Sequence, residues 1–257
     1  MEVELIAMTD VVMPDMGYKD NGLYGEKFAA EYVCDHAARA CTSVDLKPLI
    51  TEDDTYLFWE DDDKKALKAA LKSGHESIIE NAVYTFEIKG VSRALLAQLS
   101  RHRLISLAVQ SQRYVNKVAF EYVTPESIRD NPNSLEQYEW GMKVIQKVYN
   151  TMLSWGVDKE DARLILPNAC TTNIVLTANA RELRHIFALR CCERAQWEIR
   201  ELANRMLKIC KEVSPTIFED AGPSCVRDGF CREQRSCGRA PKLEKILETM
   251  NKMEVDE

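Results

Sequence analysis

Apolar and polar residues recur along this chain at spacings that predict long helices beside a small sheet. In residues 26–41, the apolar side chains of Phe28, Ala29, Tyr32 and Val33 recur three and four positions apart. That spacing is the period of an amphipathic helix, which places its apolar side chains on one face. The stretch is therefore predicted to be a helix packed against the core.

Shorter elements follow in the next part of the chain. Residues 64–73 predict a second helix, which Gly74 ends as a C-terminal cap. Residues 82–89 alternate between apolar and polar side chains, which is the pattern of a half-buried strand. A short helix over residues 92–100 then delivers Arg101 at its C-terminal end.

The second half of the chain continues with helices and strands. Asn179 has a capping-box form with Glu182 three residues later, so it starts the longest predicted helix, and Pro215 ends that helix. The predicted elements are a strand over residues 116–123, a helix over residues 135–155 that begins after Asn131-Pro132-Asn133, a short helix over residues 159–166 closed by Pro167, a strand over residues 171–177, and a helix over residues 179–213.

These elements predict an α+β fold in which long helices pack beside an antiparallel sheet. No internal repeat, low-complexity segment or linker composition occurs before residue 220. We therefore expect a single domain over residues 1–220, followed by a charged tail over residues 221–257 that contains cysteines.

Composition narrows the class of protein. The 257 residues carry a net charge of −7, which argues against broad nucleic-acid binding, and no apolar run approaches the roughly 20 residues that span a bilayer. Nine cysteines are an odd number and do not resemble an extracellular disulfide framework, so we expect the reduced cytoplasm and no membrane partner. The acidic runs at residues 52–54 and 60–63 are interpreted as solvated charge rather than metal sites.

The segment from Arg101 to Arg113 carries the strongest chemical signal. Arg101, His102, Arg103 and Arg113 bring four potential cations into 13 residues of a net-acidic protein, interleaved with hydroxyl and amide side chains. A guanidinium presents paired donors that match a phosphate. A solvated basic turn is the alternative, but the apolar runs on both sides favour a pocket for a multiply charged anion.

Several ordered blocks extend this signal to a family resemblance. The blocks are Gly74-His75-Glu76-Ser77, Arg101-His102-Arg103 with Ser111 after seven intervening residues, Glu160-Asp161-Ala162-Arg163 through Pro167, and Asn179-Ala180-Arg181 with His185 and Arg190. Together they resemble the flavin-dependent thymidylate synthases over roughly residues 26 to 220, in the order and at about the spacing of that family.

The resemblance implies a fold, a reaction and its small molecules. It implies the flavin-dependent thymidylate synthase fold and the reductive methylation of dUMP to dTMP. Methylenetetrahydrofolate would be the carbon donor, FAD the hydride carrier and NADPH the reductant. It also implies a homotetramer with active sites shared between subunits. The chain has no Gly-x-Gly and no Pro-Cys, so neither a dinucleotide fingerprint nor the nucleophile of the flavin-free synthases is present.

The resemblance assigns most of the candidate residues to the flavin or to the nucleotide. The cofactor-binding set is His75, Ser77, Arg101, His102, Arg103, Val109, Asn179, Arg181 and His185. The substrate-binding set is Gln98, Arg101, Gln110, Ser111, Arg113, Arg163 and Arg190. Arg190 is also the catalytic candidate, since a guanidinium beside the uracil imide favours its ionised form.

Each of these assignments has a structural alternative. His75 is also interpretable as a buried histidine near a helix end, and Asn179 as a helix cap only. Arg163 is also interpretable as an exposed helix arginine in an ion pair with Glu160, and Arg190 as forming a salt bridge with Glu193 or Glu182 within one long helix. His36 has no matching role and is expected to be a core or surface residue.

One departure from the family pattern weakens the site assignment. Ala108-Val109 stands where relatives commonly have Asn-Glu, so a carboxylate that often contacts nucleotide and flavin is missing, and Gln110 is the adjacent candidate to compensate. A non-catalytic nucleotide-binding regulator therefore stays an alternative. A nucleic-acid-binding module that uses residues 101–113 is a weaker one.

The tail cysteines are not expected to bind a metal. Cys225, Cys231 and Cys237 are separated by five residues each, whereas zinc sites prefer shorter spacing and need four ligands. A structural metal is a minority interpretation of this spacing, and we expect no metal centre.

Overall fold

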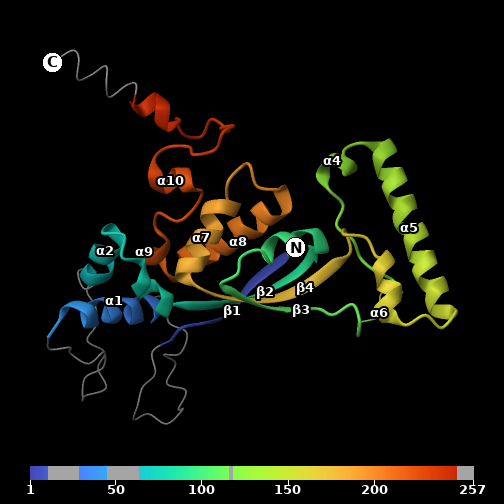
Figure 1. Cartoon of the computed structure of the whole chain (residues 1–257), viewed down its shortest axis with the longest axis horizontal. Helices are drawn as coiled ribbons and strands as arrows, with labels where there is room; N and C mark the ends of the chain where they lie inside the picture. The colour runs from blue at the N-terminus through green and yellow to red at the C-terminus, as the bar shows by residue number, and fades with distance from the viewer. Residues whose placement is uncertain (11–28, 45–63, 116–117, 248–257) are drawn as a thin grey trace, which may run out of the picture. The chain divides into compact units, whose positions relative to one another are not determined.

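The structure is a computed structural model that describes residues 1–10, 29–44, 64–115 and 118–247 (Figure 1). The acidic runs at residues 52–54 and 60–63, the first residues of the helix predicted from residue 26, and the acidic end of the tail lie outside the described residues. In the described part of the chain, no helix is both long enough and apolar enough to cross a membrane.

Four strands form one antiparallel sheet in the order β1-β2-β4-β3. Their bounds are Glu2–Met8 for β1, Val83–Ser92 for β2, Ile105–Val109 for β3 and Thr171–Asn179 for β4. In β2 the side chains of Tyr84, Phe86 and Ile88 are fully buried, as the alternation of residues 82–89 predicted. The central strands are thus amphipathic, with one face turned to the core.

The chain divides into two compact units, and the division runs through β1, β2 and β4. Unit 1 comprises residues 1–4 and 87–176, and unit 2 comprises residues 5–86 and 177–257. The domain predicted over residues 1–220 and the tail predicted over residues 221–257 stay predictions.

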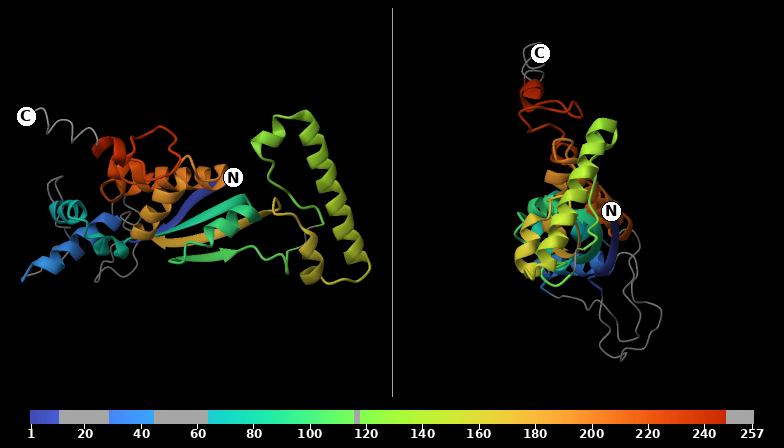
Figure 2. Two further views of the ribbon diagram at one scale, coloured as in Figure 1. Left: turned by 45° about the horizontal axis from the view of Figure 1, so that its top comes forward. Right: turned by 90° about the vertical axis from the view of Figure 1, so that its right-hand side faces the viewer.

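Unit 1 consists of sheet residues and helices that follow them. Its helical elements are α3 (Arg93–Leu99), α4 (Glu126–Arg129), α5 (Pro132–Ser154), α6 (Lys159–Ala162) and the 3-10 helix η2 (Arg163–Ile165). Asn131 caps α5 by accepting a hydrogen bond from the Ser134 N–H. Figure 2 shows α5 beside α6, and α5 packs on a small core of Phe120, Met142 and Cys170.

Unit 2 contains most of the remaining helices. They are α1 (Ala29–Thr42), α2 (Lys65–Lys72), the 3-10 helix η1 (Glu76–Asn81), α7 (Ala180–Arg190), α8 (Trp197–Val213), α9 (Pro215–Phe218) and α10 (Ser224–Asp228). Ring contacts of Phe218 with Tyr84 and Phe187 bring α9, β2 and α7 into one core.

Two buried carboxylates of α1 hold other elements of unit 2 in place. Glu31 accepts hydrogen bonds from the N–H groups of Thr216 and Ile217 at the start of α9 and pairs with Lys64. Asp35 accepts a hydrogen bond from the Leu67 N–H in the first turn of α2, at 2.9 Å. Side chains from α1 therefore satisfy helix N–H groups that the local sequence leaves unpaired.

The strand predicted over residues 116–123 is wrong in the described part of that range. Residues 118–123 form only one isolated bridge, between Tyr122 and Cys170, and side chains of α5 hold the segment instead. Gln146 accepts a hydrogen bond from the Phe120 N–H, and Asn150 donates one to the Val118 carbonyl. The strand of this region is β3, which lies inside the cation-rich motif.

The single helix predicted over residues 179–213 is also wrong. Its two parts, α7 and α8, are separated by residues 191–196. The Gln196 side chain caps α8 by accepting hydrogen bonds from the N–H groups of Glu198 and Ile199. The connector contains neither glycine nor proline, so residue types alone did not indicate the break.

Smaller boundaries also shift. The long helix α5 begins at Pro132, three residues before the prediction, and the helix predicted over residues 159–166 is α6 followed by η2. The other predicted elements are confirmed within about three residues: α1 in its described part, α2, β2, α3 and β4.

Candidate functional site

The Arg-His-Arg triplet sits in a tight turn between α3 and β3 in unit 1. Ser92 caps α3 by accepting a hydrogen bond from the Leu95 N–H, and the helix ends just before the triplet. Arg101 and Arg103 are exposed, whereas His102 is buried, with 6% of its surface accessible. The turn therefore offers two guanidiniums to solvent and holds the imidazole inside.

Strand β3 leads from this turn to the second half of the motif. Val109 is half-buried and Ala108 exposed, and the Gln110 N–H donates to the Asn173 carbonyl on β4 at 2.9 Å. After the strand, the Ser111 hydroxyl accepts a hydrogen bond from the Arg113 N–H at 3.2 Å. The sheet thus anchors the start of the turn that carries Ser111 and Arg113.

Glu160 brings together two arginines that lie 50 residues apart in the sequence. Its carboxylate forms an ion pair of 2.7 Å with Arg113, and its backbone carbonyl accepts a hydrogen bond from Nε of Arg163 at 2.9 Å. Both arginines were predicted to bind phosphate. The alternative for Arg163, an ion pair with Glu160, is wrong, because the carboxylate of Glu160 pairs with Arg113 instead.

Arg93, at the start of α3, is a cation that the sequence reasoning missed. Its side chain is half-buried, and burial lowers the pKa of its guanidinium. The charge of Arg163 lowers that pKa further, while Cys170 raises it. Arg93 stands eight residues before the motif, so only its packing identifies it as part of this group.

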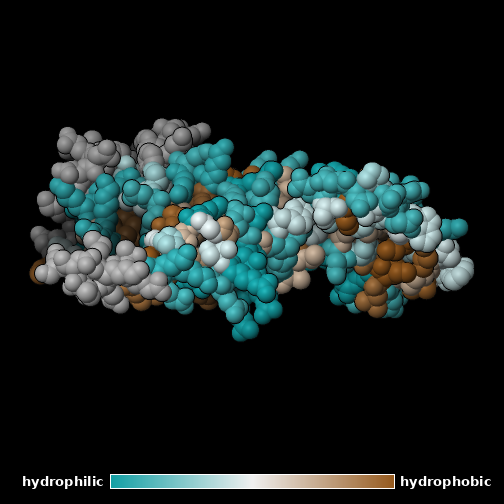
Figure 3. Space-filling view, turned by 90° about the horizontal axis from the view of Figure 1, so that it is seen from above, coloured by the Kyte–Doolittle hydropathy of each residue, from teal (hydrophilic) through white to brown (hydrophobic). Residues whose placement is uncertain are grey.

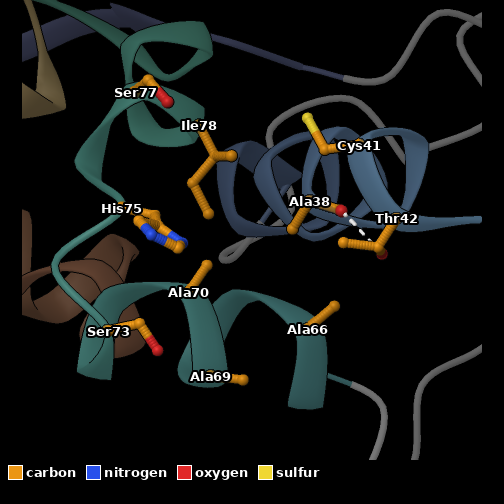
Figure 4. Close-up of a pocket in the computed structure, with 10 residues that line it drawn as sticks. All are labelled: Ala38, Cys41, Thr42, Ala66, Ala69, Ala70, Ser73, His75, Ser77 and Ile78. Atoms are coloured by element: carbon orange, nitrogen blue, oxygen red, sulfur yellow. Dashed lines mark hydrogen bonds between the residues drawn. The ribbon is translucent and has the colours of Figure 1, made fainter.

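A second group of predicted residues borders a cavity in unit 2 (Figure 4). The cavity has a volume of about 370 Å³. Its lining comes from α1 (Ala38, Cys41, Thr42), α2 and its C-terminal cap (Ala66, Ala69, Ala70, Ser73) and the start of η1 (His75, Ser77, Ile78). Small alanine side chains on the two helices leave this space open. The sequence reasoning missed the α1 wall.

The turn before His75 explains how this side chain reaches the cavity. Gly74 has φ +76° and caps α2, with its N–H donating to the Leu71 carbonyl and the His75 N–H donating to the Ala70 carbonyl. This double hydrogen bond is the Schellman arrangement, which favours glycine at the left-handed position. His75 is exposed rather than buried, so the alternative of a buried histidine is wrong.

The start of α7 carries three more predicted residues. Asn179 is half-buried and caps the helix by accepting a hydrogen bond from the Glu182 N–H at 2.9 Å. Arg181 is exposed and pairs with Glu80 on η1 at 2.5 Å. His185 is exposed one turn further along. The Arg181–Glu80 pair ties the start of α7 to the element that carries Ser77.

Arg190 is half-buried and is the last residue of α7, so it stands at a helix end rather than inside one long helix. Its predicted alternative partner Glu193 pairs with Arg200 and Arg239, each at 2.9 Å. The tail therefore contacts the connector that follows Arg190, through Arg239.

The buried side chain of Arg184 links α7 to neighbouring elements of unit 2. Arg184 on α7 binds Asp220 with two hydrogen bonds and donates another to the Ile217 carbonyl, and its Nε lies 3.5 Å from Glu76. Burial by itself would raise the pKa of Asp220, but the hydrogen bonds and charge of Arg184 bring that pKa below its ordinary value. This network connects α7 to the start of η1.

The structure therefore sorts the predicted residues into two sets, one in each unit. Unit 1 holds Gln98, Arg101, His102, Arg103, Val109, Gln110, Ser111, Arg113 and Arg163, and unit 2 holds His75, Ser77, Asn179, Arg181, His185 and Arg190. Among the described residues, no group of three or more histidine, cysteine, aspartate or glutamate side chains is arranged to hold a metal ion.

Comparisons with known proteins cover the part of the chain that carries these residues. A family model described as thymidylate synthase complementing protein matches residues 26–216. A protein of Geobacter sulfurreducens is 46% identical over 188 residues, which cover 72% of this chain and 81% of the relative. A protein of Clostridium tetani is 42% identical over 233 residues, covering 84% and 92%, and one of Pyrococcus abyssi is 46% identical over 183 residues, covering 68% and 75%. All three are named flavin-dependent thymidylate synthase.

Proposed function

This chain belongs to the family of flavin-dependent thymidylate synthases, and we propose that it methylates dUMP to dTMP with methylenetetrahydrofolate, FAD and NADPH. Methylenetetrahydrofolate is the proposed carbon donor and NADPH the proposed reductant. The observation that carries the proposal is the meeting of Arg113 and Arg163 at Glu160, because it gathers phosphate-binding groups from distant parts of the chain.

The proposed role of the unit 1 cations is to bind the phosphate of dUMP. Arg113 and Arg163 supply charge-assisted donors, and the Ser111 hydroxyl adds a further donor beside them. Gln98 and Gln110, both half-buried, are the proposed amide contacts to the nucleotide. Truncating Arg113 to alanine is expected to weaken dUMP binding more than flavin binding.

The unit 2 cavity suits part of a flavin nucleotide. Its volume of about 370 Å³ is at the lower end of the range for ligand pockets, and its wall is mainly apolar with a few polar groups at the rim. We assign His75, Ser77, Asn179, Arg181 and His185 to cofactor binding. The exposed guanidiniums of Arg101 and Arg103 join them in that assignment, with His102 and Val109. When bound, FAD supplies the hydride that reduces the transferred carbon.

Arg190 is the proposed catalytic residue. A guanidinium next to the uracil imide stabilises the ionised ring, because an opposite charge favours the anion. No cysteine nucleophile is invoked. The work assigned to the protein is to orient the nucleotide and to stabilise developing negative charge.

A homotetramer with shared active sites is the proposed assembly, and the surface of α5 supports it. Trp140, Val144 and Val148 recur every four residues and are 63%, 39% and 38% exposed, with Trp155 beyond the helix end at 80%. In Figure 3, hydrophobic surface gathers at the right-hand end of the view, where α5 and α6 lie. Such contiguous apolar surface is typical of protein contacts. Sedimentation of the purified protein as a stable, fully active monomer would exclude this assembly.

The first experiment measures dTMP. The purified, flavin-stripped protein is incubated anaerobically with dUMP, methylenetetrahydrofolate and NADPH, with or without FAD. Formation of dTMP that requires FAD is the expected result. Saturable dUMP and FAD binding without dTMP would support the regulator instead, with Ala108-Val109 as the place where chemistry was lost. Absence of dUMP binding would refute both.

We also propose that the protein resides in the reduced cytoplasm, where its nine cysteines would stay free.

A further inference from the structure

Arg184 on α7 is a buried arginine with one carboxylate at each end of its guanidinium. Its two terminal nitrogens bind Asp220, and its Nε lies 3.5 Å from a carboxylate oxygen of Glu76. The accessible fractions are 9% for the Arg184 side chain and 27% for the Glu76 side chain. Within the part of the chain that the structure describes, Nε makes no hydrogen bond, so Glu76 balances the charge at this end. A buried cationic donor of this kind depends on the carboxylate beside it.

Glu76 stands between two residues that line the unit 2 cavity. His75 and Ser77, its neighbours in the chain, both border that cavity (Figure 4). The carboxylate of Glu76 contacts Arg184 on α7 instead. One short stretch of backbone is thus shared between the cavity wall and α7. Because adjacent residues move together, a contact that fixes Glu76 also restrains His75 and Ser77.

A second ion pair joins the same two elements. Arg181 on α7 pairs with Glu80 on η1 at 2.5 Å, and both side chains are about half accessible. Arg181 and Arg184 are three residues apart, a spacing that places both on one face of the helix. The exposed pair contributes little by itself, so most of the restraint is expected from the buried Arg184. We call these two pairs the α7–η1 clamp.

We propose that Arg184 is a positioning residue for the flavin, because through Glu76 it holds the turn that presents His75 and Ser77 to the cavity. This inference rests on the proposed function, which assigns both residues to cofactor binding. Asn179, a third residue of that assignment, caps the start of α7. The clamp therefore fixes the two elements of the proposed cofactor site against each other. Binding groups keep a productive geometry only where neighbouring contacts hold them, and Arg184 does so without touching the flavin.

The test measures FAD affinity by fluorescence titration of the flavin-stripped, full-length protein. Glu76→Gln keeps the size of the side chain and removes its charge. It is expected to weaken FAD binding about 3- to 10-fold, between the effects of an exposed and a buried ion pair. The affinity for dUMP at saturating FAD is expected to stay unchanged, because the proposed phosphate-binding groups lie in unit 1. Glu201→Gln is the matched control, since Glu201 forms an exposed ion pair with Arg205 on α8, and it is expected to alter neither affinity.

A double variant separates positioning from general stability. Arg184→Met is expected to weaken FAD binding about as much as Glu76→Gln, and the two changes together no more than about twofold further, because both break one contact. In urea denaturation, Arg184→Met is expected to keep most of its destabilisation in the Glu76→Gln background, since the bonds to Asp220 and Ile217 are lost in either case. If Arg184→Met does not fold, Glu76→Gln and its control still decide the question.

The outcomes separate this inference from the proposed function. Unchanged FAD affinity in Glu76→Gln, or additive losses of FAD affinity in the double variant, would overturn the positioning role. Equal weakening of FAD and dUMP binding would overturn it too, because a general loss of structure would then explain both. These results would leave the proposed function standing as long as the wild type binds FAD. Wild-type protein that binds no FAD would refute the proposed function, and the positioning role with it.

Discussion

The ion pair of Arg184 with Asp220, in which the arginine side chain is buried, should contribute measurably to the stability of unit 2. Arg184 is 9% exposed, binds Asp220 through both terminal nitrogens and also donates to the Ile217 carbonyl. Replacing it with methionine keeps most of the side-chain volume and removes the charge and all three hydrogen bonds. The change therefore isolates the polar contribution from packing.

The expected loss follows from the burial of each partner. Breaking a buried ion pair costs about 3–5 kcal/mol when the remaining charge stays buried. The Asp220 side chain is 50% exposed, so its carboxylate regains water when Arg184 is removed. The buried Ile217 carbonyl keeps no replacement donor, at a cost of about 1–3 kcal/mol. Together these considerations predict a loss of about 2–3 kcal/mol in the free energy of unfolding.

Urea denaturation followed by circular dichroism measures this loss as a shift of the midpoint at constant slope. Arg205→Met on α8 is the matched control, since Arg205 forms an exposed ion pair with Glu201 in which both side chains are about half accessible. The control is expected to change the free energy by less than about 0.5 kcal/mol. If Arg184→Met costs no more than the control, the reasoning from burial is refuted.

Four further predictions concern unit 2. Asp35→Ala leaves the Leu67 N–H unpaired and should cost about 2 kcal/mol in chemical denaturation; a loss as small as that of the Arg205 control would contradict it. Gly74→Ala meets no atom within 4 Å but must keep φ +76°, so a loss of about 1 kcal/mol is expected in the same assay, and a gain would show that the turn relaxes. Arg190→Ala should abolish dTMP formation while flavin titration stays near wild type; wild-type turnover would remove its catalytic assignment. Because Arg184 lowers the pKa of Asp220 below its ordinary 3.8, this pair stabilises the fold above that pH, and the stabilisation is lost as the pH falls through the folded-state pKa. Asp220→Asn should flatten the acid limb of a stability-pH profile, and an unchanged limb would contradict the assignment.

Local residue patterns predicted most of the helices and strands correctly, because the features that form and end these elements lie within a few residues of one another. The alternation in β2, the glycine cap of α2 and the Asn179 cap of α7 depend on neighbours within a few residues. The break after Arg190 was not predictable in this way. The side chain that caps the next helix is Gln196, which is not among the usual capping residues.

The candidate site was predicted unevenly for the same reason. Residue types and order indicated Arg113, Arg163 and His75 through a family resemblance, and their roles stay predictions. They did not identify Arg93, or the α1 wall of the cavity with Cys41 and Thr42. Nothing in the sequence near these residues distinguishes them from ordinary helix positions, since their role depends on what packs against them.

The sequence by itself determined the α+β class, most helix and strand positions, the family and the set of cations available for an anion. Only the tertiary structure decided which charges meet: Glu160 with Arg113 across 47 positions, and Arg184 with Asp220 across 36. Periodicity and caps follow from the backbone's own hydrogen-bonding needs over one or two turns. Pairings between distant charges depend instead on which segments the core brings together, and on how much water burial leaves around each group.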